Sequence, residues 1–200
     1  MELNGESVPP WDFRVPGVTS ISVDPHKFGW STKPCSCILY RDFETYKYQL
    51  TEISDWSGGI HLTPNIQGSR AGGAVASIWA VMNFLGEEGF LRHTKTMMRA
   101  TMDLARGINQ IEGLKLTVWP ETNNVCFEAE NAEAIDIMAV AEGMESLGWY
   151  AMSRNQRPPS IVLKVQPVHE AVVQKYLEDL RKVARQVENE GTKTKKKAAY

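Results

Sequence analysis

The stretch that decides the fold of this chain reads Ser22-Val23-Asp24-Pro25-His26-Lys27-Phe28-Gly29. Residues 18–23 alternate and are β-branched, which predicts a short strand, and Asp24-Pro25 predicts the turn that ends it. A lysine at a strand end, between a histidine and an aromatic residue, can be held away from bulk water. Desolvation favours the neutral amine that Schiff-base chemistry requires. Taken alone, such a lysine is more often an ordinary surface residue of an Asp-Pro turn.

A second motif stands directly before a predicted helix and reads Gly68-Ser69-Arg70-Ala71-Gly72-Gly73. Glycines, a hydroxyl and an arginine at a helix N-terminus suit a phosphate or another anion. The competing interpretation is a plain glycine-rich start of a packed helix, with Ser69 as its cap and Arg70 paired with an acid. This motif alone leaves both interpretations open.

The composition is that of a globular protein, with 42% hydrophobic and 23% charged residues. The 22 Lys+Arg against 24 Asp+Glu give a net charge of -2, so we expect no nucleic-acid partner. Residues 191–200 carry four lysines and no acid, which leaves a body of -6, and we expect this basic tail to be disordered. The N-terminus shows no signal peptide, and no apolar run is long enough to cross a bilayer.

The three cysteines are too few for a disulfide framework, and their spacing with histidine matches no metal motif. We therefore expect no metal site, and we expect Cys35, Cys37 and Cys126 to be buried as small hydrophobic residues.

The chain changes character along its length. Residues 1–17 are irregular, 35–40 predict a second strand, and 43–65 have no clean period, which predicts a long functional loop. Residues 74–84 are apolar all round, which predicts a helix buried on several sides. The remaining predictions are a helix over 87–111 bent near Gly86 or Gly89, strands at 114–119 and 125–128, a helix at 131–147, strands at 150–152 and 161–165, and a helix from Pro167 to about 187.

The two N-terminal strands are apolar, yet no helices alternate with them to cover a sheet. We therefore expect residues 1–70 to be the end of a larger domain, followed by an α+β or α/β layer.

Together the motifs resemble the sphingosine-1-phosphate lyases of the pyridoxal-phosphate (PLP) dependent group II decarboxylase family. The resemblance is carried by residues 11–22 and 24–29, by Asp55-Trp56-Ser57-Gly58-Gly59, by Gly68-Ser69-Arg70 and by Gly72-Gly73. It is dense over residues 10–89 and continues as a weaker pattern to about residue 182. It implies an α/β fold of the fold-type I PLP-dependent transferase kind. Residues 1–85 would end the large PLP-binding domain, 86–190 would form the small C-terminal α+β domain, and 191–200 the tail.

The resemblance also implies roles for individual residues. Lys27 would form a Schiff base with PLP, and His26 would lie beside the cofactor phosphate. Gly68 and Ser69 would approach that phosphate from the neighbouring subunit of a homodimer with shared active sites. His61 stands where the family has a tyrosine, and a histidine can still transfer protons at neutral pH.

The implied reaction is cleavage of a sphingoid base 1-phosphate, a lipid phosphate, into a fatty aldehyde and phosphoethanolamine. His61 in place of tyrosine favours an alternative, decarboxylation of an amino acid. The family's aspartate for the pyridine nitrogen, its ring-stacking histidine and its phosphate loop all lie upstream of the matched segment, so we expect a C-terminal part of a larger enzyme. A third possibility is accordingly an inactive truncated or split chain. Eukaryotic members are anchored in the endoplasmic reticulum membrane with a cytosolic catalytic domain, and that anchor is not in this chain.

Overall fold

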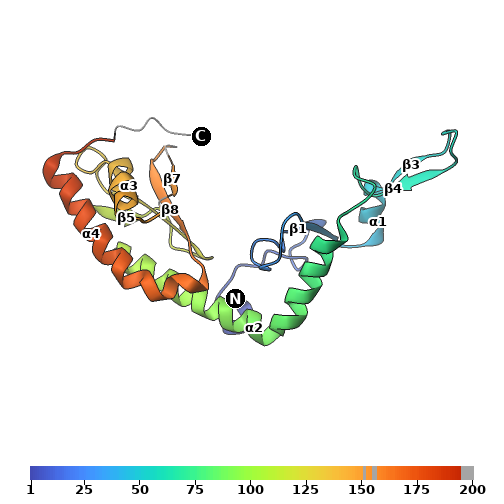
Figure 1. The fold of residues 1–200 in the computed structure, drawn as a ribbon, viewed down its shortest axis with the longest axis horizontal. Coiled ribbons are helices and arrows are strands. Elements are labelled where there is room, and N and C mark those ends of the chain that lie inside the picture. The colour runs from blue at the N-terminus through green and yellow to red at the C-terminus, as the bar shows by residue number, and fades with distance from the viewer. Residues whose placement is uncertain (151, 155–156, 195–200) are drawn as a thin grey trace. The chain divides into compact units, whose positions relative to one another are not determined.

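The computed structural model describes residues 1–150, 152–154 and 157–194. They divide into two compact units, shown in Figure 1. The N-terminal unit comprises residues 7–90, and the C-terminal unit comprises residues 1–6 and the chain from Leu91 onward.

The N-terminal unit is built from two small antiparallel hairpins and the first part of a long helix. The strand β1 (Ser20–Val23) pairs with β2 (Cys37–Tyr40), as the sequence predicts. The prediction of a long loop over residues 43–65 is wrong. That segment holds α1 (Phe43–Tyr46), the 3-10 turn η2 (Lys47–Gln49), and the strands β3 (Thr51–Ile53) and β4 (His61–Thr63), which pair with each other.

Polar contacts tie these hairpins together. The guanidinium of Arg41 donates to the carbonyls of Val18 at 2.7 Å, Phe13 at 2.9 Å and Val15 at 3.0 Å. The side chain of Gln49 accepts from the hydroxyl of Tyr40 and donates to the carbonyl of Pro64 at 2.5 Å. The N-terminal unit is therefore held to a large extent by hydrogen bonds to the backbone.

The helix α2 (Gly72–Ile108) is interrupted at Gly86, whose φ of 56° and ψ of -176° are not helical. This confirms the bend predicted near Gly86 or Gly89. The prediction that residues 74–84 are buried on several sides is wrong. Within residues 7–90, all of which the structure describes, Ala74 is the only buried apolar side chain, and Trp79 is 69% and Phe84 88% exposed. Only one side of this part of α2 is partly covered within the unit, where Ser77 and Ile78 are half-buried and the Thr32 amide donates to the Ser77 hydroxyl at 3.2 Å.

The C-terminal unit has a conventional core. Four antiparallel strands lie in the order β5-β6-β8-β7. These strands are β5 (Leu114–Leu116), β6 (Asn124–Ala129), β7 (Met152–Arg154) and β8 (Ser160–Lys164). The remaining elements are η1 (Glu2–Asn4), α3 (Ile137–Ser146), η3 (Pro167–Val172) and α4 (Val173–Glu190). The side chains of Ile108, Phe127, Met144, Ile161 and Leu180 are fully buried.

The predicted order of helix, two strands, helix, two strands, helix is confirmed, including Pro167 at the start of the last helical segment. The helix predicted over 131–147 begins only at Ile137, because Asp136 caps it by accepting from the amides of Met138 at 2.9 Å and Ala139 at 3.4 Å.

The prediction of a disordered tail fails for its first residues. The amide of Thr194 donates to Asp136 at 2.8 Å, and the ammonium of Lys193 donates to the carbonyl of Glu133 at 3.2 Å. Residues 195–200 lie outside the described residues. In the part of the chain that the structure describes, no helix combines the length and apolarity needed to span a bilayer.

Because Asp136 serves both the N-terminus of α3 and the segment after α4, we expect Asp136→Ala to lower the free energy of unfolding by about 1–2 kcal/mol. Urea unfolding followed by circular dichroism measures this. Asp136→Asn keeps an acceptor at the cap, so its free energy of unfolding should fall by less than half as much. Equal losses of stability for the two variants would contradict the capping role of Asp136.

Candidate active site

The turn after β1 is tightly closed. The amide of Lys27 donates to the carbonyl of Asp24 at 2.9 Å, and the amide of Ser31 donates to the carbonyl of Pro25 at 3.1 Å. A Cβ atom on Gly29 would lie 2.6 Å from the Pro25 oxygen, so only glycine fits at that position. The turn therefore fixes the backbone from which His26 and Lys27 project.

Asp24 holds the Lys27 side chain. The Lys27 Nζ lies 2.7 Å from Asp24 Oδ2, and the hydroxyl of Ser36 donates to Oδ1 of the same carboxylate. The hydrogen bond from Lys27, followed by that from Ser36, lowers the pKa of Asp24 below its usual value. The Lys27 side chain is 61% exposed, so the expected shielding of this lysine from water is not met in this chain.

His26 has a defined tautomer. Its Nδ1 lies 2.5 Å from the carbonyl oxygen of Cys35. Because a carbonyl oxygen only accepts, Nδ1 must carry a proton and donate it. In the neutral ring Nε2 is then an acceptor, and it can donate to an anion such as a phosphate only when the ring is an imidazolium.

A second group of polar side chains lines a cavity of about 680 Å³ between the β3–β4 hairpin and residues 64–70. His61 and Arg70 both line it. The ring of His61 stands edge-on to Trp56 at 5.9 Å, and Arg70 donates to the side chain of Asn65.

The structure thus brings His61 and Arg70 together, but not with the turn. Lys27, His26, Gly68 and Ser69 are not among the residues that line this cavity. Gly68 and Ser69 are exposed, with open space where a Gly68 side chain would lie.

Sequence reasoning missed the roles of Asp24 and Ser36. The spacing of Asp24 and Lys27, three residues apart in a turn, is the signal that could have revealed the ion pair. No local signal points to Ser36, which is twelve residues from Asp24.

The exposure of the three cysteines differs from what we predicted. Cys37 is exposed and Cys35 and Cys126 are half-buried, so the prediction of buried cysteines is wrong. Trp30, which directly follows the turn, stacks on Phe90 at 5.5 Å. Among the described residues, no group of three or more His, Cys, Asp or Glu side chains could hold a metal ion.

The turn suits PLP in its chemistry. Lys27 presents a solvent-accessible amine, and the adjacent His26 presents an imidazole that donates to an anion when protonated. An aldehyde and a phosphate are the groups that these two side chains would bind.

The chain belongs to the PLP-dependent decarboxylase family, since residues 4–130 match the family model described as the pyridoxal-dependent decarboxylase conserved domain. Within it, the chain is a homologue of the sphingosine-1-phosphate lyases. It is 42% identical to the sphingosine-1-phosphate lyase of Arabidopsis thaliana, covering 92% of this chain and 33% of that protein. It is 34% identical to the probable L-tyrosine/L-aspartate decarboxylase of Methanothermobacter thermautotrophicus, covering 88% of this chain and 47% of that protein.

Solved structures confirm the predicted fold class. The sphingosine-1-phosphate lyase of Burkholderia pseudomallei matches with a TM-score of 0.83 at 31% identity, over 92% of this chain and 41% of that chain. Glutamate decarboxylase of Lactobacillus brevis matches in fold alone, with a TM-score of 0.74 at 18% identity over 92% of this chain and 44% of that chain. The chain spans about a third of the length of the curated lyases that it matches.

The Asp24 contacts predict a titration. The pKa of Asp24 is lower in the folded chain than in the unfolded chain, so its hydrogen bonds stabilise the turn fully at pH values above the unfolded pKa. This stabilisation is lost as the pH falls through the pKa of Asp24 in the folded chain. By carboxyl NMR, Asp24 should titrate below 3.8, the usual aspartate value, and Lys27→Met should raise its pKa toward 3.8. Lys47→Met, which removes the partner of Glu44 instead, should leave the pKa of Asp24 unchanged.

Proposed function

We propose that this chain belongs to a PLP-dependent carbon–carbon lyase that cleaves sphingoid base 1-phosphates to a fatty aldehyde and phosphoethanolamine. Lys27 is the attachment point of the cofactor. The observation that carries the proposal is the turn that presents Lys27 and His26 side by side, in a chain that is 42% identical to a sphingosine-1-phosphate lyase.

The residues of the turn have separate roles in this proposal. When bound, PLP supplies an electron sink for the bond that breaks at the carbon carrying the amino group. Lys27 must leave Asp24 to bind the cofactor, and because both side chains are accessible to solvent, their ion pair exchanges easily. His26, oriented by the Cys35 carbonyl, would hold the cofactor phosphate by donating from Nε2 when its ring is an imidazolium.

The reaction is a cleavage without oxidation or reduction. The C2–C3 bond breaks, the C3 hydroxyl loses its proton and becomes the aldehyde carbonyl, and C2 gains a proton to complete phosphoethanolamine. In our proposal His61 accepts the hydroxyl proton, and Arg70 in the same cavity binds the anionic end of the substrate. Because this cavity does not include Lys27 of its own chain, both would act at an active site shared between two subunits.

A second candidate function is amino-acid decarboxylation. It is favoured by His61 in the tyrosine position and by the 34% identity to a probable L-tyrosine/L-aspartate decarboxylase. In that reaction the carboxylate leaves as carbon dioxide and the α-carbon gains a proton. The third alternative is a truncated or split chain without activity of its own.

The resemblance alone also supports two further assignments. We propose that residues 1–85 and 86–190 correspond to the end of the large domain and to the small domain of the family. We propose the cytosolic face of the endoplasmic reticulum membrane as the location of the protein.

Incubation with PLP, reduction with borohydride and peptide mapping test the cofactor role. We expect a pyridoxyl adduct on Lys27 that is absent from Lys27→Ala and retained in Lys33→Ala, a control on a lysine six residues away. An adduct distributed over surface lysines, or none on the folded protein, would rule out Lys27 as the attachment point in this chain.

Product analysis of the PLP-loaded protein with sphinganine 1-phosphate then separates the candidates. Equal amounts of aldehyde and phosphoethanolamine support the lyase. Carbon dioxide from tyrosine or aspartate supports the decarboxylase, and no product from any of these substrates supports the inactive chain.

We further propose that the protein is a homodimer whose subunits share active sites. The first part of α2 exposes Val75, Trp79 and Met82, which are spaced as one helical stripe and are each more than half exposed. Such a stripe requires a partner surface. Gly68 and Ser69, which lie just before this helix, would then be available to the phosphate in the partner subunit.

If the stripe forms the interface, Trp79→Glu should convert a dimer into a monomer in sedimentation velocity at micromolar concentration. Because Trp79 is 69% exposed, the variant should keep its circular dichroism spectrum. Lys95→Glu, an exposed site on the same helix, should remain dimeric. A Trp79→Glu variant that still dimerises would place the interface elsewhere.

A further inference from the structure

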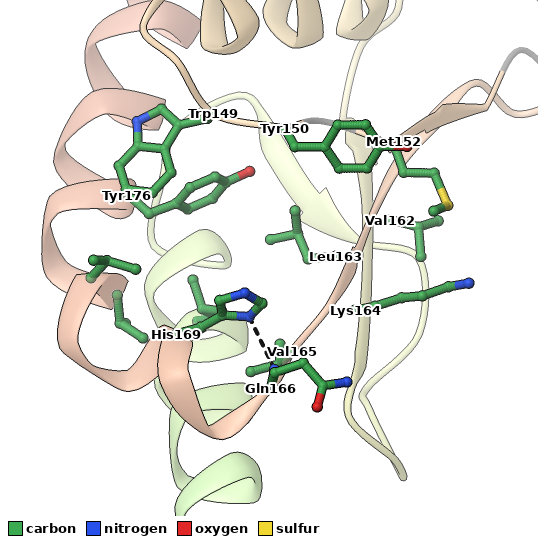
Figure 2. Close-up of a pocket in the computed structure, with 13 residues that line it drawn as sticks. Trp149, Tyr150, Met152, Val162, Leu163, Lys164, Val165, Gln166, His169 and Tyr176 are labelled. Atoms are coloured by element: carbon green, nitrogen blue, oxygen red, sulfur yellow. Dashed lines mark hydrogen bonds between the residues drawn. The ribbon is translucent and has the colours of Figure 1, made fainter. Parts of the chain in front are cut away.

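The C-terminal unit contains a cavity of about 450 Å³ between β7, β8, η3 and α4. Most of its lining is apolar and includes Leu104, Trp149, Met152, Val162 and Val173 (Figure 2). A cavity of this size and character is typical of sites for small apolar molecules.

One buried polar group in this cavity is unpaired. The side chain of Tyr176 is 6% exposed, and among the described residues its hydroxyl has no hydrogen-bond partner. Figure 2 shows this hydroxyl pointing into the cavity. Leaving a buried hydroxyl unpaired is costly, so the site favours a molecule that pairs with it. Burial raises the pKa of Tyr176 far above its usual value, and the hydroxyl therefore keeps its proton.

Neighbouring contacts hold the Tyr176 ring in place. Trp149 packs edge-on against it at 5.2 Å. The indole Nε1 of Trp149 donates to Asp179 Oδ2 at 3.0 Å, and the ammonium of Lys175 donates to Oδ1 at 2.7 Å. Trp149 is therefore engaged elsewhere through its only donor, and the phenol is held in a fixed position.

His169 supplies a second donor. Its Nδ1 accepts from the backbone amide of Gln166 at 3.0 Å, which caps η3. Nδ1 is therefore unprotonated, and in the neutral ring the proton is on Nε2. Figure 2 shows this second ring nitrogen directed into the space between His169 and Tyr176. Because Nδ1 is engaged with the cap, Nε2 is the ring atom that can donate to a molecule in the cavity.

We propose that this cavity binds a small, uncharged, apolar carbonyl compound whose oxygen accepts from Tyr176 and His169. Because two hydrogen-bond donors face the same apolar space, the bound group must be a hydrogen-bond acceptor. The Lys164 ammonium is directed away from Tyr176 in Figure 2, so it would not offset the desolvation of an anion bound beside the phenol. The carbonyl oxygen of a ketone or an aldehyde meets both requirements.

Benzophenone and diphenylmethane test this proposal as a matched pair, because they differ chiefly in the carbonyl oxygen. Isothermal titration of the 200-residue chain should show benzophenone binding at least fivefold more tightly than diphenylmethane. Tyr176→Phe should weaken benzophenone about fivefold and leave diphenylmethane unchanged. Irradiation of bound benzophenone should label peptides that line the cavity, Met152 among them.

The controls keep the test independent of folding and of catalysis. Because the Tyr176 hydroxyl has no hydrogen-bond partner in the described part of the chain, Tyr176→Phe should unfold at the same or a higher temperature than the parent chain. Tyr46→Phe, in the N-terminal unit, should leave both affinities unchanged. Equal affinity for the two probes, an unaltered affinity in Tyr176→Phe, or labelling outside the lining residues would overturn the proposal.

Discussion

Burial of apolar side chains is the constraint on which the rest of this structure depends. The C-terminal unit satisfies it with its own elements, because α2, α3 and α4 enclose side chains such as Phe127 and Leu180 against a four-stranded sheet. The N-terminal unit does not, since Ala74 is its only buried apolar side chain. There the chain is held by polar contacts such as those of Arg41 and Gln49. Net hydrogen-bond energies are small beside the burial of a whole core, so this unit depends on surfaces that cover it.

The same need for cover applies to the chemistry that we propose for Lys27. A lysine amine acts as a nucleophile only when it is neutral, and removal from water is the usual way to achieve this. In the N-terminal unit Lys27 is instead accessible and paired with Asp24. Any surface that buries the exposed apolar stripe of α2 would not by itself change this pair. A surface that also covers the turn would weaken the solvation of the ammonium and favour transfer of its proton. In the proposed enzyme, activation of Lys27 therefore needs burial of the turn in addition to burial of the stripe.

The sequence predicted the parts of the fold in which local pattern and tertiary packing agree. The helices and strands from residue 87 to 190 were of this kind, because their apolar positions do form the core. Prediction failed where three-residue strands carry no period, as in β3 and β4, and where Asp136 delays a helix that composition alone extends back to residue 131. At the candidate site the motif predicts roles for Lys27 and His26. The partners Ser36 and Cys35 could not be predicted, because the fold of the hairpin brings them to the turn.

His169 illustrates why a cavity can be invisible in the sequence. In a capping box the third residue is usually a glutamate or glutamine, and here an imidazole takes its place. A carboxylate would accept from the Gln166 amide with one oxygen and offer a second acceptor to its surroundings. The imidazole accepts from the same amide but must present a donor on its opposite side. The helix cap therefore sets the hydrogen-bonding character of the cavity wall that faces Tyr176. Replacing His169 by glutamate would keep an acceptor for the helix cap, but it would change which ligands the cavity can accept.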